Sequence, residues 1–506
     1  MSLTALLLAY VLDRNFLYQL LATLIVLLSI KITLFIRVRQ KRYQLFRYYK
    51  IPHPETDLIG GNFKVFQKPL LVLKNLHHLQ EEYGETFAFF IGDEPGLNTS
   101  DLDLLKKVFL ENMSSFKERT KLFLSIPLKH SILFASRHRW KVMRKVMSPY
   151  FSNHQMRGSE SLQFVEDSIK LMLDYIDDKM ADSKATNGRI RLDIHDLMKA
   201  ATLHMISTIA VRLPDVRVKE KDENVKSLDS FLAVADQGVV EWAIKFPFIN
   251  VFLNFLATHF EYDRTVALIH TSLNRTIDHE LARLKSKHRG SPSQTNDKLI
   301  DFLVKLHYEG KLTRQEVIGN ADAILFAGYD TTSTTLTYVS WILGKYPEIQ
   351  EKLRDDLMTY GTESIYMEQV INETMRLYPT VISFASRLAT ETVEINGMTI
   401  PQGTKVSYNA WLINRNPKIW PDPLKFDPDR FRPGVEHHPC AFAPFGLGER
   451  KCLGYQLARI EMKMILCDLL LRYRIHLVGP DNLELQIHAA ALTQPSEKVI
   501  IEVEKL

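Results

Sequence analysis

The residues with the clearest capacity for chemistry lie in a glycine-rich loop near the end of the chain. The segment Phe445-Gly-Leu-Gly-Glu-Arg-Lys-Cys452-Leu-Gly places one cysteine just before an apolar stretch that reads as a helix. The thiolate, not the thiol, binds metals, and neighbouring cations (here Arg450 and Lys451) and a helix amino terminus both favour it. The glycines allow the backbone to pass close to something large and flat. The pattern predicts that Cys452 is a thiolate ligand to a metal.

The other two cysteines carry no such context. Cys467 lies within the apolar helix that follows the loop, and Cys440 lies in the segment before it. Both are interpreted as buried core residues. Three cysteines among 506 residues leave neither a disulfide framework nor a C-x-x-C zinc site.

A second chemical pattern lies within a long apolar segment that predicts a buried helix from about Leu312 to Gly344. Helical spacing places small residues and then an acid and an alcohol on one face, namely Ala323, Ala327, Asp330, Thr331 and Thr334. A flat cofactor could pack against the small residues, and an acid beside an alcohol can move protons. The alternative is that the run of hydroxyl side chains only kinks the helix.

Two further helical motifs could bind charge. Glu373 and Arg376 are three residues apart and therefore share a helix face, where such a pair is usually a solvated ion pair. Trp140 and Arg144 are one turn apart, so both could donate hydrogen bonds to one carboxylate.

Taken together, these patterns resemble the motifs of the cytochrome P-450 family of haem-thiolate monooxygenases. The similarity rests on F-x-x-G-x-R-x-C-x-G around Cys452, E-x-x-R at Glu373, F-x-P-x-R-F ending at Phe431, and W-x-x-x-R at Trp140. It implies a mainly α fold with small β-sheets and a long central helix, with haem b bound through an axial Cys452 thiolate. It also implies an enzyme that inserts one oxygen atom from O2 into a lipophilic substrate, using electrons from NADPH through a reductase.

The resemblance assigns roles to individual residues. Ala327 and Gly328 would lie over the haem, while Asp330 and Thr331 would deliver protons for the activation of dioxygen. The remaining cofactor-binding residues, mostly for the haem propionates, are Trp140, Arg144, Arg387, Phe445 and Arg450. A structural charge cluster beside the haem would comprise Glu373, Arg376 and Arg430. The chain departs from the usual family pattern in a longer span before Arg387 and a shorter connector before Glu373.

The start of the chain predicts a membrane anchor. Between Phe16 and Ile36 the only charged residue is Lys31, and no cleavage site of small residues follows. A basic flank comes next, which keeps that side cytoplasmic, with Arg37, Arg39, Lys41, Arg42, Arg47 and Lys50. We therefore expect residues 1–50 to form an anchor with its flank and residues 51–506 to form one catalytic domain. By likeness to microsomal members of the family, the membrane would be the endoplasmic reticulum.

Charge and aromatic patterns suggest partners. The net charge of +5 is too small to indicate nucleic acid binding. By the family likeness, a basic face would dock NADPH-cytochrome P-450 reductase or cytochrome b5, through Arg137, Arg139, Lys141, Arg144, Lys145, Lys451 and Arg459. The aromatic stretch from Trp242 to Phe260 is either core or an apolar lid that touches the bilayer.

The substrate remains open at this point. The expected pocket is mainly apolar and fits many lipophilic compounds; it would comprise Phe326, Ala327, Thr331, Val381, Ile382 and part of the loop from Leu122 to Phe134. Two other functions fit a haem-thiolate protein. One is an isomerase that rearranges peroxides, against which Asp330 and Thr331 argue; the other is a haem sensor, which would bind haem without reductase-supported oxygen uptake.

Overall fold

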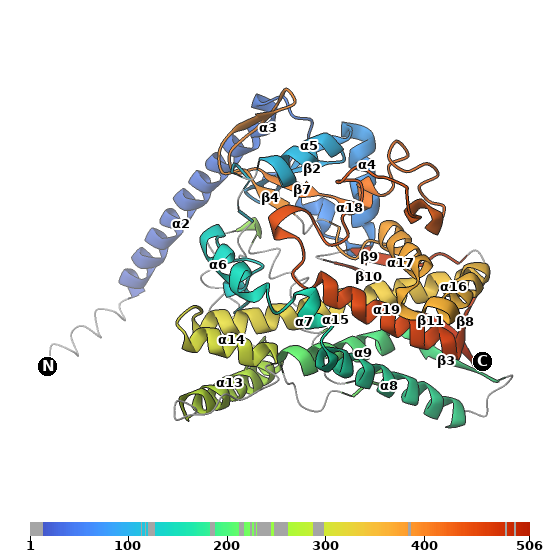
Figure 1. Ribbon diagram of the computed structural model, residues 1–506. Coiled ribbons are helices and arrows are strands. Elements are labelled where there is room, and N and C mark those ends of the chain that lie inside the picture. The colour runs from blue at the N-terminus through green and yellow to red at the C-terminus, as the bar shows by residue number, and fades with distance from the viewer. Residues whose placement is uncertain are drawn as a thin grey trace.

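The computed structural model describes most of the chain, and all structural statements below concern the described residues. These are 14–112, 114–116, 118–119, 127–182, 188–211, 217–222, 225–226, 229, 244–246, 262–286, 298–382, 386–480, 483–489 and 492–506. The molecule is mainly helical with small sheets, as the sequence predicts (Figure 1). In Figure 1 strands β2, β4 and β7 lie with α4 and α5 in the upper part, whereas α8, α9, α13, α14, α15 and α19 fill the lower part.

The long central helix is α15, which runs from Arg314 to Lys345. It begins at a capping box in which the Thr313 side chain accepts from the Glu316 backbone and the Glu316 carboxylate accepts from the Thr313 backbone. It ends before Pro347, which starts the next helix. Most of its side chains are buried, so α15 forms the centre of the core, close to the expected limits.

The helices between residues 137 and 472, apart from the short α18, share one hydrophobic core with α15. The buried residues of α3, α4, α5 and α18 belong to two separate clusters together with strands β1, β2 and β7. Helices α16 and α17 are joined by one short turn, in agreement with the short connector that the sequence shows before Glu373. The helices are α2 (Arg14–Tyr43), α3 (Leu45–Tyr48), α4 (Pro69–Tyr83), α5 (Leu102–Lys106), α6 (Arg137–Met147), α7 (Asn153–Met156), α8 (Ser159–Asp182), α9 (Ile194–Ile206), α13 (Tyr262–Ser286), α14 (Leu299–Tyr308), α16 (Pro347–Tyr360), α17 (Ile365–Leu377), α18 (Ala410–Ile413) and α19 (Tyr455–Arg472).

Four strands form the largest sheet, in the order β1-β2-β7-β4, with β2 and β7 parallel. Val406 of β7 pairs with Leu97 of β2 on one side and with Arg387 of β4 on the other. A three-stranded sheet has the order β3-β11-β8, and two hairpins pair β5 with β6 and β9 with β10. The strands are β1 (Thr86–Ile91), β2 (Glu94–Thr99), β3 (Arg189–Asp193), β4 (Ser386–Leu388), β5 (Val393–Ile395), β6 (Met398–Ile400), β7 (Lys405–Tyr408), β8 (Tyr473–Leu477), β9 (Ile487–Ala489), β10 (Thr493–Pro495) and β11 (Ile500–Lys505).

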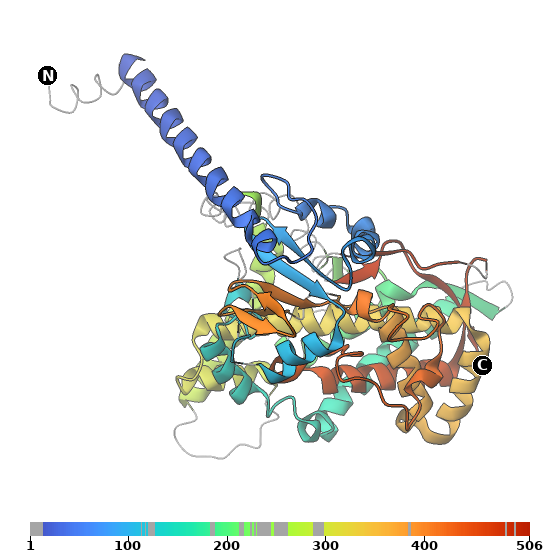
Figure 2. The same cartoon turned by 90° about the horizontal axis from the view of Figure 1, so that it is seen from above.

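Helix α2 projects away from the rest of the molecule (Figure 2). Its apolar side chains between Leu17 and Leu34 are largely exposed. The stretch Leu17–Tyr48 is long and apolar enough to cross a membrane, with a mean hydropathy of 2.2 in its most apolar window. The helix therefore has the length and surface that the sequence predicts for an anchor.

Candidate active site

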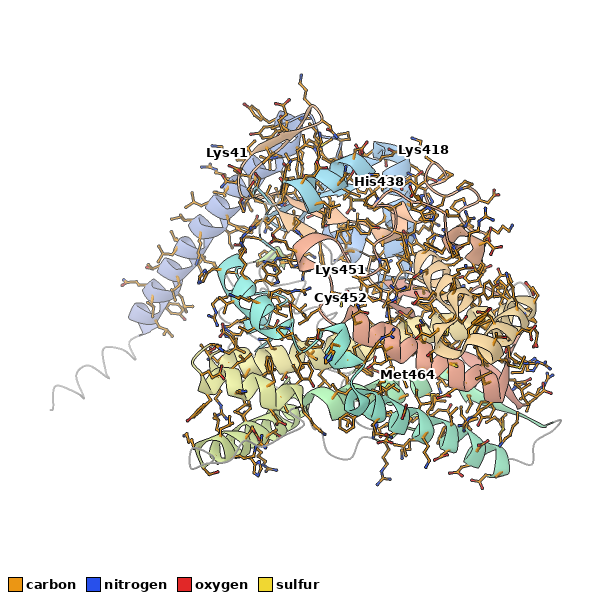
Figure 3. The ribbon with its side chains drawn as sticks, viewed as in Figure 1. Lys41, Lys418, His438, Lys451, Cys452 and Met464 are labelled. Atoms are coloured by element: carbon orange, nitrogen blue, oxygen red, sulfur yellow. The ribbon has the colours of Figure 1, made fainter. Side chains whose placement is uncertain are left out.

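The loop before α19 holds Cys452 near the centre of the molecule (Figure 3). The Cys452 backbone N–H donates to the Phe445 carbonyl over 2.8 Å, and that of Lys451 donates to the Gly448 carbonyl over 3.0 Å. Gly448 has a φ of 66°, and a Cβ there would overlap the Phe109 carbonyl oxygen. Glycine is therefore required at this position by both conformation and space. The loop is a fixed support for the thiol.

The electrostatics of Cys452 differ from those expected from the sequence. Burial raises the pKa of the thiol, and the Gly454 N–H together with the cations Arg144, Arg119 and Lys451 opposes that rise. Arg450 instead lies over the Trp140 ring, 4.5 Å from its centroid. Neighbouring charges alone therefore do not produce a thiolate. A coordinated metal ion deprotonates a thiol outright, so a ligand role would not depend on these neighbouring charges.

Two accessible residues mark open space inside the molecule. Cys452 is accessible although its thiol is desolvated by surrounding protein. Ala327 is accessible although it lies in the middle of the buried helix α15. A Cβ built on Gly446 or Gly454 would meet no atom within 4 Å. These surroundings fit a large flat group packed between the cysteine loop and α15.

Several buried arginines surround this space. Burial and repulsion by Arg119 and Arg450 lower the pKa of Arg387 to about 9. Burial and Arg450 likewise lower the pKa of Arg119 to about 10. The Arg387 Nη2 donates to the Leu447 carbonyl over 2.9 Å, but its buried Nε has no hydrogen-bond partner within the described residues. A buried group of cations is suited to bind carboxylates, and the two propionates of a haem would satisfy it.

The other predicted propionate ligands lie close by. Trp140 is buried in α6, and the Arg144 Nη1 donates to the Lys451 carbonyl over 2.9 Å. Phe445 is half-buried and lies 6.2 Å from the Tyr455 ring, at the start of α19. Arg119 was not identified from the sequence, because it belongs to no recognisable motif and reaches the site only through the fold.

The acid and the alcohol of α15 point to different surroundings. The Thr331 hydroxyl is partly accessible and donates to the Ala327 carbonyl over 2.6 Å. Asp330 is only 1% exposed, and the Gln494 Nε2 of β10 donates to its two carboxylate oxygens over 2.7 and 2.8 Å. The expectation that five residues share one face is therefore too simple. Asp330, Ala323 and Thr334 are buried, since successive residues turn by about 100°.

Gly328 also turns away from the accessible face. A Cβ on Gly328 would lie 2.8 Å from Cγ1 of Ile206 in α9. The glycine thus permits the close packing of α15 on α9, which the hydrogen bond from the Thr202 hydroxyl to the Tyr329 carbonyl, 3.0 Å long, also fixes. Of the pair Ala327 and Gly328, only the alanine is exposed to the open space.

Asp330 has the electrostatics of a proton-transfer group. Burial raises its pKa to about 6; Asp229 adds to the rise, while Lys199 and the hydrogen bond from Gln494 act against it. Lys199 in turn donates to Asp229 over 2.9 Å, and the Tyr329 hydroxyl donates to the same carboxylate over 2.7 Å. A carboxyl group with a pKa near neutrality can both accept and release a proton at working pH.

The E-x-x-R pair forms a buried charge cluster, as the family resemblance implies and not the solvated ion pair that its spacing alone suggests. Arg376 and Glu373 are fully buried in α17 and are joined by two hydrogen bonds of 2.7 and 2.8 Å. The Arg430 Nε lies 3.4 Å from Glu373, and the Asp427 N–H donates to Glu373 over 2.9 Å. Arg376 also donates to the Asn414 carbonyl over 2.6 Å. The cluster ties α17 to the loop before the cysteine and has a structural role.

The structure describes part of the predicted substrate pocket and all the cations of the predicted docking face. Phe326 and Val381 are half-buried and Ile382 is buried, whereas residues 122–126 and nearly all of the aromatic stretch from Trp242 to Phe260 lie outside the described residues. Two cations of the predicted docking face are neutralised by ion pairs, Arg139 with Glu316 and Arg459 with Glu368. The basic character of this face is therefore weaker than the sequence suggests.

Comparisons with known proteins agree with this site. The family model described as cytochrome P-450 matches residues 52–503. The relatives include CYP13A3, a cytochrome P-450 of Caenorhabditis elegans, which is 29% identical over 478 residues and covers 86% of this chain and 89% of its own. Cytochrome P-450 3A13 of Mus musculus is 27% identical over 508 residues, with 96% of each chain covered. Cytochrome P-450 3A28 of Bos taurus is 26% identical over 481 residues, with 91% and 92% covered.

Proposed function

The chain belongs to the cytochrome P-450 family of haem-thiolate monooxygenases, and on that premise we propose that Cys452 supplies the axial thiolate of its haem. One observation carries this assignment: Cys452 is the accessible cysteine at the centre of the molecule, whereas Cys440 and Cys467 are buried. Its loop is fixed by backbone hydrogen bonds and by Gly448. The haem, when bound, supplies the redox chemistry that activates dioxygen.

The protein's own residues would orient that cofactor. Ala327 would pack against its face, and Gly328 would bring α15 close enough to α9 to hold the helix in place. The propionates would bind between residues of four separate segments, with Phe445 packing beside the cysteine loop. These propionate ligands are Arg119, Trp140, Arg144, Arg387 and Arg450.

Proton delivery would fall to Thr331 and Asp330. The Thr331 hydroxyl lies on the accessible side of α15 and can pass a proton to dioxygen directly or through water. Asp330 is buried and accepts from Gln494, not from Thr331, so it would renew that proton through ordered water; its pKa of about 6 allows both protonation states near neutral pH. The substrate would be a lipophilic organic compound held near Phe326, Ala327 and Val381.

The electrons would come from NADPH through NADPH-cytochrome P-450 reductase, with cytochrome b5 as a second donor. The cations that remain for docking are Lys141 and Lys145 on α6 and Lys451 beside the cysteine, and Figure 3 places Lys451 next to Cys452. Such a face would speed the encounter with an acidic partner.

We further propose that residues 1–50 anchor the protein in the endoplasmic reticulum membrane and that residues 51–506 form one catalytic domain on the cytosolic side. The exposed apolar surface of α2 and the basic residues that follow it support this arrangement. The match to the family begins at residue 52, directly after the flank.

The difference spectrum of the dithionite-reduced protein with carbon monoxide tests the central assignment. We expect the red-shifted Soret band of a thiolate-bound haem in the full chain and in the control Cys467→Ser, and its loss in Cys452→Ser. Retention of that band in Cys452→Ser would refute the assignment.

Turnover with reductase and NADPH tests the reaction. Substrate-dependent oxygen uptake is expected of a monooxygenase, whereas an isomerase would need neither reductase nor oxygen and a sensor would show no uptake. Thr331→Ala should keep the spectrum and divert electrons to hydrogen peroxide. Unchanged coupling in that variant would refute the proton-delivery role.

A further inference from the structure

A buried arginine fixes the anchor helix against the rest of the protein. Arg39 of α2 is 1% exposed, and its Nε donates to the Asp93 carboxylate over 2.5 Å. Its Nη1 donates to the Lys245 carbonyl over 2.8 Å and also to the Ile59 carbonyl, and its Nη2 donates to the Ile244 carbonyl over 3.4 Å. The orientation of the last turns of α2 is therefore set by contacts with three other segments.

A crevice of about 600 Å³ lies beside this attachment, between α2 and the segment from Thr56 to Leu58. Its volume falls within the usual range of small-molecule sites. The α2 side is lined by Arg37, Gln40, Lys41 and Tyr43, with Gln44 directly after the helix. Figure 3 shows Lys41 at the end of α2 that meets the body of the protein. Because Arg39 holds α2 in place, both walls of the crevice are fixed in advance.

The crevice is positively charged. Arg37 and Lys41 are four residues apart and therefore share one helix face. Neither forms an ion pair within the part of the chain that the structure describes, and no acidic side chain is among the described lining residues. Asp57, which lies between the lining residues Thr56 and Leu58, is already paired with Lys64 over 2.8 Å, and Asp93 is paired with Arg39. Two cations with adjacent amide donors are suited to bind a phosphate group.

The position of the crevice along α2 indicates that the phosphate belongs to a lipid head group. Arg37 directly follows Ile36, the last residue of the apolar stretch, so the crevice lies where lipid head groups begin. Leu58 and Ile59 beside it are 43% and 39% exposed and can contact the upper part of an acyl chain. A choline head group leaves the lipid without net charge, whereas an anionic head group places net negative charge beside Arg37 and Lys41.

We propose that this crevice binds the head group of an anionic phospholipid, with the phosphate held between Arg37 and Lys41. The inference rests on the proposed membrane anchor, because a head group reaches the crevice only if α2 spans the bilayer. Bound lipid fixes the depth at which the catalytic domain sits on the membrane surface.

The test uses the full-length haem-containing protein, delipidated in detergent and titrated with dihexanoylphosphatidylserine, with bound lipid counted by native mass spectrometry. The double variant Arg37→Gln with Lys41→Gln should bind about 30-fold more weakly, since each cation near a head group contributes about 1 kcal/mol. The matched control is Arg42→Gln with Arg47→Gln, which removes the same charge from the same flank outside the crevice. It should bind as the wild type does, and all proteins should keep the carbon monoxide spectrum.

Three results would overturn the proposal. Equal losses in the two double variants would show diffuse attraction to the basic flank. Equally tight binding of dihexanoylphosphatidylcholine would remove the selectivity for anionic lipid. Competition by inorganic phosphate at the concentration of the lipid would identify a site for free anions. Alkaline extraction of wild-type membranes tests the anchor separately, since release would refute the anchor whereas retention with equal losses would refute only the crevice.

Discussion

Replacing Asp330 by asparagine should make the protein more stable at neutral pH while it impairs catalysis. Burial raises the pKa of Asp330 from 3.8 to about 6, so the folded protein holds this proton more tightly than the unfolded chain does. The unfolded chain therefore loses its proton first as pH rises, and stability falls between about pH 4 and pH 6. Above that window the raised pKa of Asp330 lowers the free energy of unfolding by about 3 kcal/mol.

The variant Asp330→Asn removes this cost because a neutral amide resembles the protonated acid, and its oxygen can still accept from Gln494. We expect the free energy of unfolding to rise by about 3 kcal/mol at about pH 7.5, by roughly half as much at about pH 5, and by little below about pH 4. Urea denaturation followed by the Soret band and by circular dichroism measures this difference at each pH.

The matched control is Asp355→Asn, which changes an exposed carboxylate on α16 and should leave the urea midpoint unchanged. In a reconstituted system Asp330→Asn should also divert electrons to peroxide. A stability difference that does not depend on pH, or a loss of stability at about pH 7.5, would refute the reasoning. The first result would mean that Asp330 is not the group that titrates, and the second that its ionised form is stabilised by the fold.

Three other substitutions test the supports of the site. Gly448→Ala should prevent haem incorporation because the new Cβ overlaps a backbone carbonyl oxygen. The control Gly434→Ala, also at positive φ but exposed, with free space and outside the cysteine loop, should cost only about 1 kcal/mol; the haem content of the purified proteins compares them. Arg376→Gln strands the buried carboxylate of Glu373 and should destabilise the protein by roughly 3–5 kcal/mol in urea denaturation. Gln494→Leu removes a hydrogen bond that stabilises the ionised acid of α15, so infrared titration of its carboxyl band should give a higher midpoint, and an unchanged midpoint would exclude the positioning role.

The parts of the fold that the sequence predicts well are specified by local signals. Helix α15 starts and stops within two residues of the expected limits, because the Thr313 capping box and Pro347 lie next to its ends. The cysteine loop is local for the same reason, since Gly448 allows the turn that presents Cys452. The residues that determine the ends of α15 and the turn of the cysteine loop all lie within short stretches of the chain.

The sequence predicts a mainly helical fold and does not identify the first two strands. Strand β1, Thr86–Ile91, is a nearly continuous apolar run, and such a run does not distinguish a strand from a buried helix. Strand β2 contains Pro95 and Gly96, both unfavourable in strands. Strand β2 forms because it pairs with β1 on one side and with β7, which lies far away in the sequence, on the other; Pro95 lies opposite Phe90 of β1, just before the pairing with β7 begins at Gly96. Tertiary pairing outweighs local preference here.

The surroundings of individual charged residues could not be predicted from the sequence either, because they also depend on distant partners. Sequence spacing treats Arg37, Arg39 and Lys41 as equal members of a flank, but only Arg39 is buried, because only its side chain finds an acid and three carbonyls across the chain. Asp330 likewise owes its surroundings to Gln494, 164 residues away. A motif thus indicates which groups are candidates for the chemistry. Whether each is charged at working pH depends on burial and on distant partners, which is why the pKa of Cys452 is raised where its neighbours in sequence suggested the opposite.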